Sequence, residues 1–181
     1  MQSRRWFLVY SSAGVALAAS GLLSWRALAA SSADAPASAV LPATVPRGSE
    51  SFEVTHTEAE WHKLLNDAQF DVLRNAGTER PYSSPLNSEH RSGRFSCAGC
   101  QLPVFSSSTK FESHTGWPSF TSPLEHAVAE NRDTSFGVER VEVHCRRCGG
   151  HLGHVFDDGP DPTGLRYCMN GVAMTFAPGQ A

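Results

Sequence analysis

Cysteines carry the clearest chemical signal in this sequence. Four of the five form two Cys-x-x-Cys pairs, Cys97 with Cys100 and Cys145 with Cys148, separated by 44 residues. Each pair can supply two thiolates to one tetrahedral ion, and the glycines beside the pairs allow the tight turns that such a site needs. The pairing predicts one closed, structural zinc ion per chain. Iron could occupy the same four thiolates.

Two other uses of these four cysteines remain open. In an oxidising compartment they could form disulfides, and thioredoxin-type redox centres also contain a Cys-x-x-Cys motif. A thioredoxin-type motif is expected once, between a strand and a helix, whereas this sequence has two such motifs among strand-forming segments. We therefore favour metal binding. Structural zinc contributes on the order of 10 kcal/mol of apparent free energy, so folding and metal loading would be coupled.

Cys168 is the cysteine that remains, in the run GLRYCMN at 164–170. A single leftover thiol indicates a reactive or intermolecularly paired cysteine, with a buried, inert one as the alternative. Arg166 and Asn170 lie two residues to either side. On a strand they would share its face, where they could stabilise a thiolate or orient its attack.

Two more runs contain residues suited to chemistry. HLGHVF at 151–156 follows the second cysteine pair, and GWPSF at 116–120 lies between the two pairs. Taken alone, the histidines could form a second metal site or fill a structural role, and a Trp-Pro pair is common in cores. Neither run decides a function by itself.

The order of five motifs resembles that of the B-type peptide methionine sulfoxide reductases, across roughly residues 55 to 177. The motifs are GTERP (77–81), CAGC (97–100), GWPSF (116–120), CRRCGGHLGHVF (145–156) and GLRYCMN (164–170). The resemblance implies a mainly β fold of two antiparallel sheets with short N-terminal helices, stapled by a structural zinc site. It also implies reduction of the R epimer of methionine sulfoxide, which repairs oxidised proteins.

The same resemblance implies a substrate site. Its catalytic residues would be Cys168, His151, His154, Arg166 and Asn170, and its substrate-binding residues Trp117 and Phe156. Cys168 would attack the sulfoxide sulfur as a thiolate, and the two histidines would place water or a proton on the departing oxygen. Trp117 would receive the methyl group. An imidazole that titrates near neutrality is a suitable proton source for this oxygen.

The sequence departs from the common family pattern at Thr115, where many members carry a second, resolving cysteine. Because the other four cysteines are assigned to the metal, a sulfenic acid on Cys168 would have no partner thiol within the chain. We therefore expect direct reduction by an external thiol, either a thioredoxin-like protein or a small molecule.

Composition and patterning indicate the elements that must position these residues. With 181 residues, 40% of them hydrophobic and 18% charged, the chain fits one ordinary globular domain. Thr57 and Glu60 form a capping box, after which a short helix should place Trp61, Leu64 and Leu65 on one face. A second helix should cover 67–76, with Phe70 and Leu73 facing inward, and stop at Gly77.

Short strands separated by turn residues are expected after these helices. The clearest covers 138–144, where Val141 and Val143 should face inward and Glu142 and His144 outward. Other strands are expected near 102–105, 154–156, 165–169 and 172–176.

The first 29 residues have the features of a signal peptide. Arg4 and Arg5 precede an apolar run at 13–23, followed by the small-residue triplet Ala27-Leu28-Ala29. The apolar run is too short to cross about 30 Å of hydrocarbon as a helix. The segment SRRWFL at 3–8 resembles the twin-arginine signature, which implies export of the folded protein to the bacterial periplasm. Residues 30–50, rich in Ala, Ser and Pro, should form a flexible linker before a reductase domain at 51–181.

The net charge of the chain indicates which classes of binding partner are unsuitable. Removing residues 1–29 takes away three arginines and no acids, which moves the formal net charge from −3 to −6. An acidic protein is poorly suited to nucleic acid or to anionic membrane. We expect a monomer without a membrane anchor. The rival functions are a zinc-ribbon binding module and a periplasmic thiol-disulfide oxidoreductase, which metal and free-thiol counts would separate.

Overall fold

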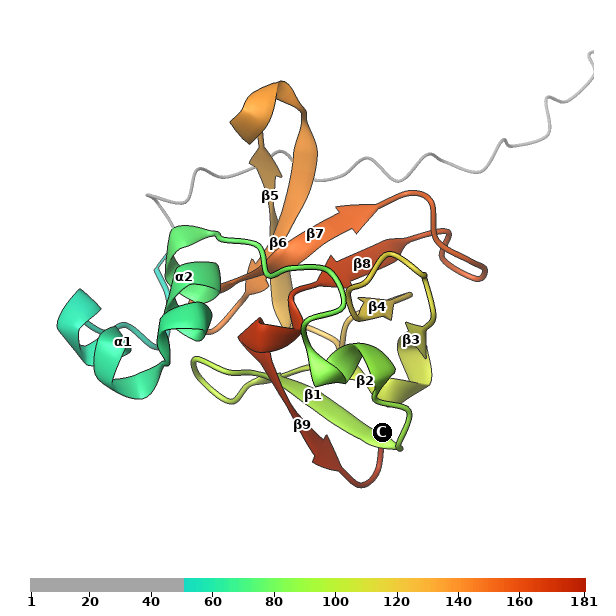
Figure 1. The fold of residues 1–181 in the computed structure, drawn as a ribbon, viewed down its shortest axis with the longest axis horizontal. Helices are drawn as coiled ribbons and strands as arrows, with labels where there is room; N and C mark the ends of the chain where they lie inside the picture. Colours follow the sequence, from blue (N-terminus) through green and yellow to red (C-terminus); the bar gives the residue numbers. More distant parts are fainter. Residues whose placement is uncertain (1–50) are drawn as a thin grey trace, which may run out of the picture. The chain divides into compact units, whose positions relative to one another are not determined.

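The computed structural model describes residues 51–181. The predicted signal peptide (1–29) and linker (30–50) lie outside the described residues. Within 51–181 the fold is mainly β, with two antiparallel sheets and two short helices (Figure 1). This confirms the predicted fold class. In this part of the chain, no helix is long and apolar enough to cross a membrane.

Helix α1 (Glu58–Leu64) begins at the predicted capping box. The Thr57 hydroxyl accepts a hydrogen bond from the Glu60 N–H, and the Glu60 carboxylate accepts one from the Thr57 N–H at 2.8 Å. Trp61 is buried as predicted, but Leu64 is 57% exposed. The predicted apolar face was therefore too wide, because Leu64 is rotated by about 60° around the helix axis from Trp61, toward solvent.

Helix α2 (Asp67–Asn75) follows directly and packs against strand β7 (His151–Phe156) and the 3-10 helix η5 (Gly171–Ala173). Asn66 and Gln69 form a second capping box, and Phe70 and Leu73 are buried, as predicted. This helix holds the N-terminal end of the described chain against the body of the domain.

Helix α2 ends one residue before the predicted bound at 76 and stops ahead of Gly77, as predicted. Its C-cap residue, Ala76, is in the left-handed conformation (φ 55°). A Cβ atom at Gly77 would lie 3.1 Å from the backbone carbonyl of Asp71 and 2.3 Å from the flexible carboxylate of the same residue. The glycine thus permits close backbone approach to the helix that precedes it.

The strands form two sheets, both antiparallel. The three-stranded sheet has the order β2-β1-β9, and the six-stranded sheet the order β3-β4-β8-β7-β6-β5. Their bounds are β1 Gly93–Cys97, β2 Pro103–Ser106, β3 Lys110–Phe111, β4 Ser119–Phe120, β5 Val128–Asp133, β6 Arg140–Cys145, β7 His151–Phe156, β8 Arg166–Met169 and β9 Met174–Pro178. Short 3-10 helices connect them: η2 Pro85–Ser88, η3 Ser107–Thr109, η4 Ser135–Gly137 and η5 Gly171–Ala173.

Strand β6 corrects the predicted alternation of buried and exposed side chains. Glu142 and His144, expected to face solvent, are 8% and 0% exposed. The reason is that both have partners on their own face of the sheet. Glu142 contacts the His151 ring at 2.6 Å, and the Phe52 ring packs edge-on against His144 at 5.8 Å.

Aromatic side chains join the two sheets. Phe95 on β1 and Phe105 on β2 pack against Phe120 on β4, with ring centroids 5.0 and 4.4 Å apart. All three rings are fully buried, and each contributes roughly 2 to 3 kcal/mol through burial. Tyr167 on β8 joins this core. Because side chains alternate along a strand, its neighbour Cys168 faces the opposite side of the six-stranded sheet.

Cross-strand pairing aligns the polar residues on that opposite face. Ser119, Cys168, His154 and Glu142 are successive pairing partners on β4, β8, β7 and β6. Directly paired residues point to the same side of a sheet, with Cβ atoms about 5 Å apart. The register therefore collects four chemically active side chains from segments far apart in the sequence.

A β-bulge adds His151 to this face. Val143 pairs with Gly153, but the next residue, His144, pairs with His151, so that β7 contains one extra residue. His151 and His154 are three residues apart and would point to opposite faces of a regular strand. With the bulge, their rings lie on the same side, 5.3 Å apart.

Candidate active site and metal centre

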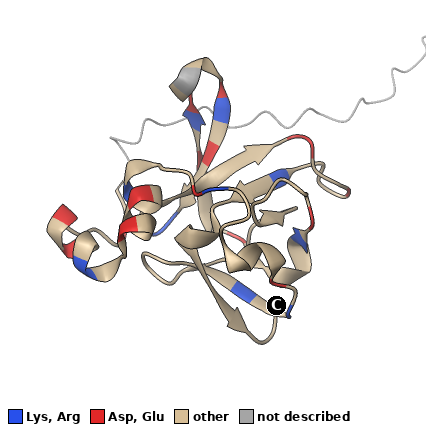
Figure 2. Cartoon of the chain, in the orientation of Figure 1, with Lys and Arg blue, Asp and Glu red and all other residues tan. Residues whose placement is uncertain are grey.

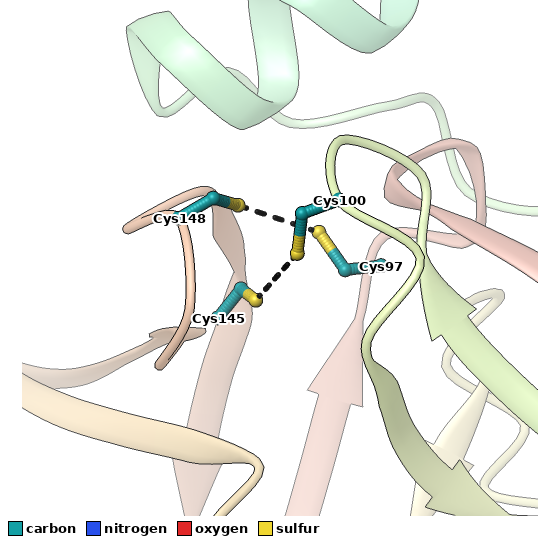
Figure 3. Close-up of side chains that lie close together, drawn as sticks. All are labelled: Cys97, Cys100, Cys145 and Cys148. Carbon is teal, nitrogen blue, oxygen red and sulfur yellow. Dashed lines mark hydrogen bonds between the residues drawn. The ribbon is translucent and has the colours of Figure 1, made fainter. Parts of the chain in front are cut away.

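The four paired cysteines meet at one point between the two sheets. Cys97 ends β1 and Cys145 ends β6, and each is followed by a tight turn that returns Cys100 or Cys148 to the same place (Figure 3). Their sulfur atoms all lie within 4.8 Å of one another. The Cys97–Cys148 and Cys100–Cys145 sulfur distances are 3.7 and 3.4 Å. Tetrahedral Zn–S bonds of about 2.3 Å place sulfurs about 3.8 Å apart, so the cluster fits one metal ion.

Helix α2 supports this cluster from outside. The Arg74 guanidinium donates hydrogen bonds to the carbonyls of Cys148 (3.1 Å) and Gly149 (3.2 Å) and lies over the Trp61 ring at 4.8 Å. Gly149 takes a positive φ of 67°, which the turn after Cys148 requires. The positive charge of Arg74 lies close to the turn that would carry two metal-bound thiolates.

None of the five cysteines forms a disulfide. The shortest sulfur separation in the cluster, 3.4 Å, is far longer than a disulfide bond of about 2.05 Å. The two pairs also converge on one centre. This arrangement favours a shared metal ion over two disulfides or over a separate thioredoxin-type pair.

A cavity of about 150 Å³ opens beside Cys168. Five of the seven predicted catalytic and substrate-binding residues line it, and its full lining is Thr78, Trp117, Arg140, Gly153, His154, Phe156, Cys168 and Asn170. The other two predicted residues, His151 and Arg166, are not part of the lining. Each contacts a residue that does line it, His151 the ring of His154 and Arg166 the ring of Phe156.

The Cys168 thiol lies in a mostly buried position. Burial raises its pKa, and this effect outweighs the opposite influence of the Arg166 charge and of the Thr115 and Ser119 hydroxyls. The Thr115 hydroxyl lies 3.9 Å from the sulfur. At neutral pH the resting group is therefore a thiol, and forming its thiolate requires a proton acceptor.

Arg166 is held rigidly beside Cys168. Its guanidinium makes a two-pronged ion pair with Asp158, at 2.8 and 2.9 Å, and lies over the Phe156 ring at 4.4 Å. The ion pair with Asp158 raises the pKa of Arg166, so its charge is permanent. Phe156 thus contributes to the cavity wall and also fixes the position of the arginine.

His154 is oriented by the β5–β6 hairpin, on which acidic and basic residues are interspersed (Figure 2). Its Nε2 lies 2.8 Å from the Asp133 carboxylate, which also accepts a hydrogen bond from Arg140 at 2.7 Å. Burial opposes ionisation of Asp133, but hydrogen bonds from Ser135 and His154 and the charge of Arg140 lower its pKa overall. An ionised Asp133 only accepts hydrogen bonds, so Nε2 carries a proton and Nδ1 is the acceptor in neutral His154.

Neutral His154 is the favoured form. Burial lowers its pKa and outweighs the hydrogen bond to Asp133. His151 lies behind it, 1% exposed, with Nδ1 2.6 Å from Glu142. The two rings are in edge contact, so His151 limits how the His154 ring can turn.

Glu79 connects the two sides of the cavity that are lined by Trp117 and by Asn170. Its backbone carbonyl accepts the Trp117 indole N–H at 3.2 Å, and its backbone N–H donates to the Asn170 side chain at 3.0 Å. Its carboxylate accepts two further hydrogen bonds from the backbone of Gly171 and Val172, at 2.6 and 3.0 Å. Asn170 also donates to a carbonyl of β7. In this structure Asn170 therefore fixes the backbone around Cys168 and also lines the cavity.

Residues 65–178 match the SelR domain family. The chain belongs to this family. Its relatives include peptide methionine sulfoxide reductase MsrB of Pseudomonas putida strain W619, 52% identical over 127 residues, which cover 70% of this chain and 96% of that protein. Proteins of the same name from Agrobacterium fabrum (48% identical, 94% of its length) and Bradyrhizobium diazoefficiens (50%, 91% of its length) match the same share of this chain.

Several residues of this SelR domain site were not predicted from sequence. Glu79 and Ser119 lie inside quoted motifs, GTERP and GWPSF, so the motifs themselves were the available signal. Asp133, Glu142 and Asp158 had no local signal, because their partners are distant in sequence and are brought near only by strand register and by the β7–β8 connection.

Proposed function

We propose that this chain is a peptide-methionine (R)-S-oxide reductase that repairs oxidised methionine in proteins, with Cys168 as its nucleophile. The observation that carries the proposal is a single metal-free thiol at a small cavity lined by Trp117 and His154, in a SelR domain. The relatives are named peptide methionine sulfoxide reductases. A zinc-ribbon binding module would not explain this cavity.

The reaction is a two-electron exchange between two sulfur atoms. The Cys168 sulfur attacks the sulfoxide sulfur, the S–O bond breaks, and oxygen is transferred to the cysteine. The substrate is reduced to methionine, and the thiol is oxidised to a sulfenic acid that keeps the thiol hydrogen as its hydroxyl.

His154 provides the path for that proton. Its neutral form, with Nδ1 as acceptor, can take the proton from the buried thiol as the thiolate attacks. The resulting imidazolium, stabilised by Asp133, then delivers the proton to the departing oxygen. His151 contributes by holding the His154 ring.

Trp117 and Phe156 give the cavity its apolar surface. The indole N–H of Trp117 is already bonded to Glu79, so the ring presents an apolar wall to the methyl group of the substrate. The Trp117 ring on one side and the proton donor His154 on another distinguish the two sulfoxide epimers. With the methyl group against Trp117, only one epimer places its oxygen near the histidine.

The sulfenic acid is reset by an external thiol. One thiol forms a mixed disulfide with Cys168 and releases water, and a second thiol releases the cysteine as a disulfide of the reductant. The other four cysteines are gathered in the metal centre, and Thr115 stands at the usual resolving position. We expect the enzyme to act as a monomer.

The decisive experiment supplies the protein with separate R and S epimers of a peptide methionine sulfoxide and a dithiol. The expected result is methionine from the R epimer alone. Equal turnover of both epimers, or none, would contradict the proposal. A thiol-disulfide oxidoreductase would instead reduce an added disulfide peptide without consuming sulfoxide.

Zinc is the metal that best suits the four-cysteine centre. Four thiolates in a closed tetrahedral arrangement are its usual structural site, and redox-inert zinc would keep them out of the cysteine chemistry at Cys168. Residues Cys97, Cys100, Cys145 and Cys148 would hold one ion. Elemental analysis of purified protein should find one zinc per chain and no stoichiometric iron.

Export to the periplasm through the twin-arginine route is part of the same proposal. The pattern at Arg4 and Arg5, with the apolar run and the triplet at 27–29, supports it. Transport of a folded, metal-loaded protein would protect the four thiolates from oxidation. Replacing both arginines by lysine should retain the protein inside the cell, as cell fractionation would detect. Unchanged export of that variant would contradict this route.

A further inference from the structure

Three hydroxyl groups form a hydrogen-bonded chain that ends at the sulfur of Cys168. The Ser119 hydroxyl donates to the backbone carbonyl of Trp117 at 3.1 Å. The Ser113 and Ser119 oxygens are 2.7 Å apart, and the Ser113 and Thr115 oxygens 2.9 Å apart. Thr115 in turn contacts Cys168 at 3.9 Å, within hydrogen-bonding range for sulfur. The chain thus joins the nucleophile to the loop that carries the Trp117 wall.

The carbonyl at one end sets the direction of the chain. Because the Ser119 proton is given to Trp117, Ser119 accepts from Ser113, and Ser113 accepts from Thr115. The Thr115 oxygen then accepts from the Cys168 thiol. Every hydroxyl proton has an acceptor in this arrangement, which agrees with a resting thiol that is protonated.

Loss of the thiol proton leaves three hydroxyl protons for four contacts, so the three hydroxyls rotate together. Ser119 donates to Ser113, and Ser113 donates to Thr115. The bond from Ser119 to the Trp117 carbonyl is given up. The Thr115 hydroxyl can rotate and donate to the negatively charged sulfur, and a hydrogen bond to a charged acceptor is about twice as strong as a neutral one. The same hydroxyl can afterwards bond to the oxygen of the sulfenic acid. Thr115 can therefore partner the cysteine in each state that the reaction produces.

We propose that Thr115 is a catalytic residue whose hydroxyl, aligned by Ser113 and Ser119, donates a hydrogen bond to the Cys168 thiolate and to its sulfenic acid product. At this position the side chain would stabilise the oxidised cysteine until an external thiol arrives, in place of forming a disulfide with it. The inference rests on the proposed reductase function for its purpose, but the contact with the sulfur can be tested without it.

The test compares Thr115→Val, which keeps the shape and removes the hydroxyl, with Thr115→Ser, which keeps the hydroxyl. The rate of Cys168 alkylation by iodoacetamide is measured against pH, with the modified peptide identified by mass spectrometry. His154, Arg166 and Arg140, the ionisable groups around Cys168 on β7, β8 and the β5–β6 hairpin, stay in place in both variants. Thr115→Val should move the alkylation midpoint upward by about one pH unit. Thr115→Ser should leave it near the wild-type value.

A second readout follows the sulfenic acid. After one turnover without reductant, hydrogen peroxide is added as the oxidant, and Thr115→Val should lose the singly oxidised form to sulfinic acid several times faster than Thr115→Ser. Identical midpoints for wild type and Thr115→Val would overturn the proposal. If Thr115→Val does not fold, as judged by melting temperature and metal content, Ser113→Ala should give a smaller shift in the same direction, and no shift would also overturn it. A shifted midpoint in a protein without sulfoxide reductase activity would refute the proposed function and leave this contact standing.

Discussion

The four-cysteine cluster and the Cys168 site differ in how many sulfur atoms meet and in what lies beside them. In the cluster, four sulfurs lie within 4.8 Å of one another at the ends of two strands from different sheets. At Cys168, one sulfur lies in the middle of a strand and faces a cavity of about 150 Å³. The first arrangement completes the shell of a metal ion, whereas the second leaves room for a substrate.

The comparison teaches that surroundings decide what a cysteine does. A metal ion keeps thiolates deprotonated and removes them from reaction. Cys168 lies outside the cluster, and burial raises the pKa of its thiol, so we expect its reaction to need a proton acceptor such as His154. We therefore expect cysteine to serve stability in the cluster and chemistry at position 168.

Removing one cysteine from the cluster should produce the largest effect. Cys97→Ser replaces a buried ligand, and metal binding at such sites contributes about 10 kcal/mol or more of apparent folding free energy. We expect loss of the metal together with a fall in melting temperature of tens of degrees, checked by elemental analysis and calorimetry. A metal-free variant that melts like wild type would show that the cluster does not stabilise the fold.

Replacing Cys168 should abolish activity and leave the metal content and the stability unchanged. Cys168→Ser should lower reductase activity on the order of 10⁴-fold or more, the scale found when a covalent nucleophile is lost. Metal content and melting temperature should stay close to those of wild type, because Cys168 lies outside the cluster. Initial rates with the R epimer would check this. Substantial residual turnover would assign the nucleophile elsewhere.

A smaller effect is expected from the charge beside the nucleophile. Arg166→Met removes a positive charge that lowers the pKa of Cys168, so this pKa should rise further. The rise of activity with pH that follows deprotonation of the Cys168 thiol should move upward by about one pH unit, and activity at pH 7 should fall roughly tenfold. The pH profile of kcat/KM checks the shift, and Arg166→Lys should restore part of it. An unchanged profile in the methionine variant would mean that the charge does not act on the sulfur.

The smallest effect concerns His154 and stability. Burial is the main reason that the pKa of His154 is lower in the folded protein than the value of about 6.5 expected in the unfolded chain. At a pH between these two pKa values, the unfolded chain binds more protons than the folded protein. This contribution to stability is present above about pH 6.5 and is lost as pH falls toward the folded pKa. His154→Asn should therefore reduce the pH dependence of unfolding between pH 7 and 5, by about 1 kcal/mol or less. Chemical denaturation at both pH values measures it, and an equal slope in both proteins would argue against the lowered pKa.

Local signals in the sequence predicted local features well. The capping box at Thr57 and the paired cysteines depend on residues a few positions apart, and the structure confirms the helix start and the gathering of the four sulfurs. The roles of the individual site residues remain predictions. Trp117, for example, lines the cavity beside Cys168.

Side-chain contacts between residues on different strands were not predictable from the sequence. Glu142 looked like an exposed alternate residue of a strand, and only pairing of β6 with β7, together with the bulge, shows that it faces His151. The hydrogen bond from His154 to Asp133 likewise spans 21 residues. Strand register fixes such contacts, and a single sequence contains no direct record of register.

The location of Cys168 on an interior strand also has consequences for motion. Strand β8 is bonded on one side to β4 and on the other to β7, and the backbone N–H groups of Met169 and Asn170 are bonded to the carbonyls of Pro118 and Leu152 at 2.9 and 2.8 Å. Amide hydrogens in such a strand exchange with solvent only through rare, large-scale opening. We therefore expect the amide of Cys168 to be among the slowly exchanging ones, and any adaptation to varied polypeptide substrates to fall to the loop that carries Trp117.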